Sequence, residues 1–266
     1  MRKTIKDDFD LNTIAESGQC FRFNRTDDEN YKIVAHGKIL NIRKAGSNTF
    51  DFDCSEEDFK NIWHGYFDLD TNYSSIRNSV KDNSFLCECA KKSEGMRILN
   101  QDKWEMAVSF IISQRKSIPA IKTSIERLSA LCGDRIDNDT FAFPTPVQIL
   151  SAKSDKLAEC GLGYRLPYIL SAAELFFREP DIVSRLEKLS DDELLEELKK
   201  MQGVGDKVAS CISLFGFHRL DSFPKDVWIN RALAEHFPKG YDFETYRPYN
   251  GIIQQYIFYA YRNNPI

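Results

Sequence analysis

The sequence of 266 residues has no apolar run near the ~20 residues that a transmembrane helix needs. Its basic start is followed by three aspartates, where a secretory signal would need apolar residues. Low-complexity linkers and internal repeats are also missing. These absences predict a globular protein inside the cell, in the cytoplasm of a prokaryote or the nucleus of a eukaryote, with no membrane partner.

Cysteine and histidine are too few and too scattered for a metal centre. The seven cysteines contain no CxxC pair, and the four histidines lie far apart. Structural zinc sites instead bring cysteines and histidines together at short spacings. We therefore expect reduced thiols, no metal and no cofactor.

Positive charge is also in short supply, with a net charge of −4 and a pI near 5.7. Binding to duplex DNA draws on Lys and Arg contacts to phosphate, so the net charge argues weakly against a nucleic-acid partner. A small basic footprint can nevertheless coexist with an acidic far surface. Particular residues must therefore decide the question.

Up to about residue 70, polar and apolar residues alternate with a period of two. This pattern covers CFRF at 20–23, residues 31–44, and residues 49–54, where Phe50, Phe52 and Cys54 alternate with polar neighbours. It predicts an antiparallel sheet with one solvated face. Ser55 with Asp58 then marks the start of a helix.

From about residue 98 the apolar spacing becomes helical. In residues 118–133 apolar side chains fall three or four apart, Pro119 suits the first turn and Gly133 the end. Further helix starts are marked by Thr145 with Pro146, by Pro167, and by a capping-box pattern of Ser190 with Glu193. The predicted fold class is α+β, with an N-terminal antiparallel sheet domain over 1–97 packed on an all-α helix–hairpin–helix bundle over 98–266.

The candidate site begins in LKKMQGVGDKVASC at 198–211. Gly203 and Gly205 permit a tight turn whose amides face a phosphate at the start of a helix that carries Lys207. As a pattern this is weak, because an ordinary turn between helices with a solvated lysine has the same form. A Walker phosphate loop does not fit, since it follows a strand and ends in Lys-Ser/Thr, whereas Val208 follows the lysine here.

A carboxylate follows in FPKDVWINRAL, where Asp226 is placed to cap a helix that starts at Val227. Nearly the whole chain resembles one family of proteins. The segments that carry the resemblance are this one together with SGQCFRF at 17–23, ILNQDKWEMAVSFIISQ at 98–114, GLGYR at 161–165, MQGVGDKVASC at 201–211 and PYNGIIQQYIF at 248–258. The family that the chain resembles is that of the 8-oxoguanine DNA glycosylases, which belong to the helix–hairpin–helix, Gly/Pro-rich, Asp superfamily.

The resemblance implies an enzyme that flips a nucleotide out of duplex DNA. A lysine then attacks the sugar C1′, the base leaves, and the imine undergoes β-elimination at the 3′ phosphate. Lys207 matches that nucleophile, and burial together with the positive end of its helix would favour the neutral amine. Asp226 matches the essential aspartate, which stabilises positive charge at C1′.

The resemblance also assigns base recognition and duplex contacts. Gly18 matches the glycine whose carbonyl accepts the N7–H that distinguishes 8-oxoguanine from guanine. Phe258 and Cys211 match the two residues that stack on the faces of the flipped base, and Gln254 matches the residue that reads its Watson–Crick edge. Arg115 matches the residue that fills the gap left by the flipped base, and Tyr164 and Arg165 match residues beside the orphaned partner base.

The sequence departs from the family at Ala120, where an arginine that reads an opposite cytosine is expected. The implied enzyme is a monomeric, bifunctional glycosylase and AP lyase for duplex DNA containing 8-oxoguanine, with a weak preference for the opposite base. A glycosylase for another damaged base and a non-catalytic helix–hairpin–helix DNA-binding module are the alternatives. Lys207 speaks against the first, and the presence of Asp226, Gln254 and Phe258 in register speaks against the second.

Overall fold

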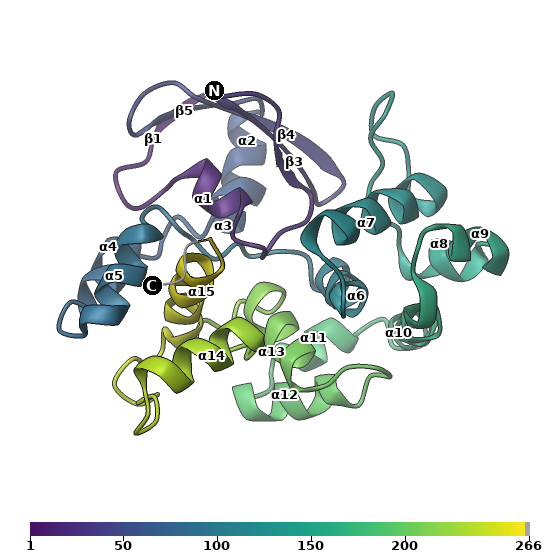
Figure 1. Cartoon of the computed structure of the whole chain (residues 1–266). Helices are drawn as coiled ribbons and strands as arrows, with labels where there is room; N and C mark the ends of the chain where they lie inside the picture. Colours follow the sequence, from purple (N-terminus) through teal and green to yellow (C-terminus); the bar gives the residue numbers. More distant parts are fainter. Residues whose placement is uncertain (264–266) are drawn as a thin grey trace.

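The computed structural model describes residues 1–263 and contains an N-terminal antiparallel sheet with the strand order β1-β5-β4-β3-β2 (Figure 1). The strands are β1 (Arg2–Thr4), β2 (Phe23–Arg25), β3 (Asn30–Ala35), β4 (Lys38–Lys44) and β5 (Thr49–Phe52). A two-residue turn joins β3 to β4, with φ of 51° at His36 and 68° at Gly37. Positive φ at both positions gives the turn the twist that a tight hairpin needs. The predicted antiparallel sheet is confirmed.

One predicted strand is wrong. In CFRF at 20–23 only Phe23 belongs to a strand, and all four residues are buried. The Phe21 ring packs edge-on at 5.6 Å from Phe110 in the helical core, whereas Cys20 and Phe23 pack into the core of the sheet. Because this segment fills two cores at once, it has no solvated face.

Helices form the rest of the described chain. Beside the sheet are α1 (Leu11–Ala15) and a continuous helical stretch made of α2 (Glu56–Asp58), a π-helical segment (Phe59–Trp63) and α3 (His64–Tyr66). The bundle contains α4 (Tyr73–Ser79), α5 (Ser84–Lys92), α6 (Lys103–Ser113), α7 (Ile118–Cys132), α8 (Pro146–Ser151), α9 (Ser154–Glu159), a 3₁₀ turn (Gly163–Arg165), α10 (Leu166–Arg178), α11 (Ile182–Leu186), α12 (Asp191–Lys199), α13 (Asp206–Phe215), α14 (Val227–His236) and α15 (Asn250–Asn263).

The predicted helix starts are confirmed by their capping bonds. Ser55 accepts from the Asp58 amide at 3.0 Å, and both Thr145 and Ser190 form reciprocal capping boxes with the residue three positions later. Gly133 ends α7, where an added Cβ would lie 2.0 Å from the Ala142 carbonyl oxygen. These helix ends therefore follow from local sequence signals.

The bundle core also takes in two helices that precede residue 97. Tyr73 and Ile76 of α4, and Leu86 of α5, are buried in the same cluster as the later helices. Figure 1 shows α5 beside α15 at the far end of the chain. The domain boundary at residue 97 stays a prediction. Within residues 1–263 no helix has both the length and the apolarity to cross a membrane.

Candidate active site at the helix–hairpin–helix

The hairpin between α12 and α13 depends on its two glycines for different reasons. Gly203 has φ +79°, and an added Cβ would lie 2.2 Å from Cδ2 of Tyr168. Gly205 has extended backbone and is the N-cap of α13, with no side chain bonded there and nothing within 4 Å of an added Cβ. Its open position leaves the first amides of α13 accessible to an anion.

Lys207 is the second residue of α13, as predicted. The expectation that it is buried is wrong, because this residue is exposed where the first turn of α13 emerges at the surface. Its Nζ lies 5.5 Å from the centre of the Phe110 ring. Lys207 is therefore accessible to a large ligand that reaches the start of this helix.

Asp226 caps α14, which confirms the predicted N-cap. Its carboxylate accepts a hydrogen bond from the Ile229 amide at 2.9 Å. This bond fixes the orientation of the carboxylate at the end of α14 that carries positive potential. A carboxylate held in this way can stabilise a cation that forms beside it without first rearranging.

Cys211 lies near both Lys207 and Asp226. It lies one turn after Lys207 on α13 and is buried. Burial raises the pKa of the Cys211 thiol, an effect that the nearby Lys207 ammonium opposes and the Asp226 carboxylate reinforces. The three side chains therefore lie close enough to influence one another electrostatically.

Gly18 and Phe258, which are far apart in sequence, are close in space. Gly18 has φ +79°, and an added Cβ would lie 3.4 Å from Cε1 of Phe258 and 3.3 Å from Cδ1 of Ile118. Phe258 is half-buried, with the Arg262 guanidinium 5.4 Å from its ring centre. The stacking role of Phe258 and the N7–H contact of Gly18 stay predictions.

Gln254 is buried on α15 and uses both ends of its amide. Its Nε2 donates to the Pro224 carbonyl oxygen at 2.9 Å, and its Oε1 accepts from Nε2 of Gln255 at 2.9 Å. The first bond holds α15 against the segment that leads into Asp226, whereas the second lies within α15. The predicted contact of Gln254 with a base edge stays a prediction.

The predicted duplex contacts fall into two groups. Arg115, Ala120 and Tyr164 are exposed, and Arg115 has φ +52° in the turn after α6. Arg165 is buried instead, and its guanidinium donates to the carbonyl oxygens of Gln114 and Leu162. The structure therefore gives Arg165 protein partners that the sequence did not predict.

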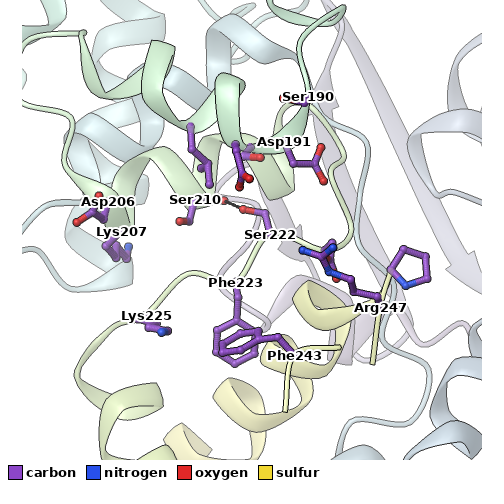
Figure 2. Close-up of a pocket in the computed structure, with 15 residues that line it drawn as sticks. Ser190, Asp191, Asp206, Lys207, Ser210, Ser222, Phe223, Lys225, Phe243 and Arg247 are labelled. Carbon is purple, nitrogen blue, oxygen red and sulfur yellow. Dashed lines mark hydrogen bonds and ion pairs between the residues drawn. The ribbon is translucent and has the colours of Figure 1, made fainter. Parts of the chain in front are cut away.

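A cavity of about 840 Å³ opens beside Lys207 between α12, α13 and the segment before α14 (Figure 2). Figure 2 shows Lys225 extending toward the same end of this cavity as Lys207. Its Nζ lies 5.2 Å from the ring centre of Phe243, which in turn packs edge-on against Phe223. Lys225 and Phe243 line this cavity but were not among the residues predicted from the sequence.

Comparison with known proteins agrees with this arrangement. The 8-oxoguanine DNA glycosylase N-terminal domain matches residues 3–107, and the HhH-GPD superfamily base excision DNA repair protein matches residues 108–245. Fold and site together thus define a base excision repair protein. The chain belongs to the 8-oxoguanine DNA glycosylase family within that superfamily.

Two solved structures and one curated relative show the extent of the similarity. An 8-oxoguanine glycosylase/lyase from Clostridium acetobutylicum, bound to duplex DNA with cytosine opposite 8-oxoG, has 32% identity and a TM-score of 0.92 over 100% of this chain and 99% of that one. MBOgg1 in complex with a low-affinity DNA ligand has 35% identity and a TM-score of 0.93 over 98% and 95%. A probable N-glycosylase/DNA lyase from Methanothermobacter thermautotrophicus is 32% identical over 65% of this chain, which spans 62% of that relative.

Proposed function

We propose that this chain is a bifunctional DNA glycosylase, which excises 8-oxoguanine from duplex DNA and then cleaves the strand as an AP lyase. The observation that carries the proposal is that Lys207, at the start of α13, and Asp226, at the start of α14, both lie near Cys211 in a member of this family. An amine and a fixed carboxylate are the groups needed for attack at C1′.

In the proposed reaction the neutral amine of Lys207 attacks C1′, and the base leaves with the electrons of the glycosidic bond. Asp226 stabilises the positive charge that develops at the sugar during this step. Loss of a proton from C2′ of the resulting imine then expels the 3′ phosphate. The open amides at Gly205 are suited to hold a phosphate oxygen while this happens.

We propose that base selection depends on Gly18 and Phe258, which lie close together in space. We assign the Gly18 carbonyl to the N7–H of 8-oxoguanine, Phe258 and Cys211 to the two faces of the base, and Gln254 to its Watson–Crick edge. The short distance from Gly18 to the Phe258 ring supports this assignment. One rim of the pocket thus comes from the N-terminal segment and the other from α15.

Opposite-base preference should be weak because Ala120 cannot donate a hydrogen bond. A good bidentate contact to a base edge contributes ~1–3 kcal/mol of discrimination. We therefore expect excision rates opposite all four bases to agree within about tenfold, and Ala120→Arg to restore some preference for cytosine. Single-turnover rates on the four duplexes measure this, and a hundredfold preference of the wild type for cytosine would contradict it.

Borohydride trapping tests the proposed chemistry. Wild-type protein should form a covalent adduct with an 8-oxoguanine duplex, and Lys207→Gln should not. Lys225→Gln is the matched control, because Lys225 is an exposed lysine on the same cavity and should leave trapping intact. Trapping by Lys207→Gln at the wild-type level would show that the nucleophile lies elsewhere.

A panel of duplexes separates the alternative functions. Excision of other damaged bases but not of 8-oxoguanine would identify a glycosylase for another lesion, and binding without excision would identify a non-catalytic module. We further propose that the protein acts as a monomer on duplex DNA. Light scattering of the free and DNA-bound protein measures this directly.

A further inference from the structure

The turn between α6 and α7, residues 114–117, contains Arg115, the residue proposed to fill the gap left by the flipped base. Its first residue, Gln114, bonds in two directions. Its backbone carbonyl oxygen accepts from Nε of Arg165 at 2.8 Å and from Nη2 of the same guanidinium. Its side-chain Nε2 donates to the carbonyl oxygen of Gly203 at 3.1 Å, and to that of Ile111 at 3.2 Å.

These bonds belong to a closed ring of contacts that returns to the hairpin. The Arg165 guanidinium lies 4.4 Å from the ring centre of Tyr164, and Tyr164 packs edge-on against Tyr168 at 6.1 Å. Tyr168 in turn lies directly against the Cα of Gly203, where no Cβ fits. The ring therefore joins the 114–117 turn, the 163–165 turn and the hairpin.

A second connection reinforces the first. Nζ of Lys116 donates to the carbonyl oxygen of Gly161 at 2.6 Å and contacts Oγ of Ser124 at 2.5 Å. Partial burial, and after it the positive charges of Arg165 and Arg127, lower the pKa of Lys116. The turn is thus held by Gln114 and Lys116 on either side of Arg115, whose exposed side chain is free to enter DNA.

We propose that Gln114 is a positioning residue, which sets the distance between Arg115 and the phosphate-binding hairpin, and that Arg165 holds it from the other side. This inference rests on the proposed function. When the hairpin binds the backbone, Gln114 places Arg115 at the matching point of the base stack. Arg165 then acts through the protein and not by reading the orphaned base.

The test uses Gln114→Met, which keeps the length of the side chain and removes both N–H donors. Single-turnover excision is measured on two duplexes, one with cytosine opposite 8-oxoguanine and one with an abasic analogue at that position. Filling the gap left by the flipped base with Arg115 should matter most when 8-oxoguanine is paired with an opposite base before it is flipped. We expect about a tenfold loss on the cytosine duplex, or ~1.4 kcal/mol, and less than a twofold loss on the other.

Arg165→Met should show the same selective loss, and the double variant should lose less than the product of the two single effects, because both residues act through one network. Borohydride trapping on a pre-formed abasic site opposite an abasic analogue should stay at the wild-type level. Equal losses on both duplexes would indicate a general structural defect and overturn the inference. No loss on either duplex would overturn it as well.

Failure of the proposed function would be seen separately, as the absence of 8-oxoguanine excision by the wild type. Gln114 is then tested with 2-aminopurine at the lesion position, whose fluorescence rises when the base leaves the stack. The wild type should raise this fluorescence on binding and Gln114→Met should raise it several-fold less. Equal increases in the two proteins would overturn the positioning role.

Discussion

Replacing Gly203 by alanine should lower the free energy of unfolding much more than replacing Gly205 by alanine. At Gly203 an alanine would hold φ at +79°, which costs ~1–2 kcal/mol for a residue with a Cβ. Its Cβ would also lie 2.2 Å from Cδ2 of Tyr168, and relieving such a clash costs ~1–3 kcal/mol. We therefore expect Gly203→Ala to lower the free energy of unfolding by about 2–5 kcal/mol.

Gly205→Ala is the matched control on the same turn. Gly205 has φ −103° and nothing lies within 4 Å of an added Cβ, so the change should cost below about 1 kcal/mol. Urea unfolding of both variants measures the difference, and DNA binding by the folded fraction shows whether the hairpin has kept its shape. Equal losses in the two variants, or a loss below about 1 kcal/mol at Gly203, would refute the reasoning.

Three further changes test the pocket and the core. Asp226→Asn keeps a good helix cap but removes the charge, so DNA binding should persist while single-turnover excision slows by at least about tenfold. Phe258→Ala should weaken binding to lesion DNA by ~1–3 kcal/mol and binding to undamaged duplex much less. Burial raises the pKa of Glu105 to about 8, despite the opposing charge of Arg22, so the folded state keeps a proton that the unfolded state releases above its ordinary pKa of 4.5. This stabilisation is complete below pH 4.5 and is lost as the pH rises toward 8. In urea unfolding, the free energy of unfolding of Glu105→Gln should therefore be higher than that of the wild type by roughly 2–4 kcal/mol above pH 8, and equal to it near pH 4.5.

Features that depend on a few neighbouring residues could be predicted from the sequence. The starts of α12 and α14 follow from Ser190 and Asp226, whose side chains bond amides three positions later. β1 was missed because its three residues acquire their partner only when β5 pairs with them, about fifty positions away. Its ladder carries no local signal.

The site divides in the same way. The position of Lys207 in its helix was predictable, but its exposure depends on how the hairpin sits on the bundle. The proximity of Gly18 and Phe258 came only from the resemblance, since no periodicity connects residues so distant in sequence. The partners of Arg165 could not be predicted, because a buried guanidinium bonded to carbonyls looks in sequence like any surface arginine.

The segment SGQCFRF at 17–23 has two structural roles, because it carries Gly18 of the proposed pocket and also joins the sheet to the helical bundle. Its Phe21 and Phe23 enter different cores, and Gln19 between Gly18 and Cys20 is buried, with its amide bonded to the backbone at Arg97 and Leu99. A substitution here that altered the pocket rim would also disturb the joint between sheet and bundle. Phe258 on α15 is half-buried and lies beside Gly18, so a change at Phe258 would alter the proposed pocket without replacing a residue of this segment.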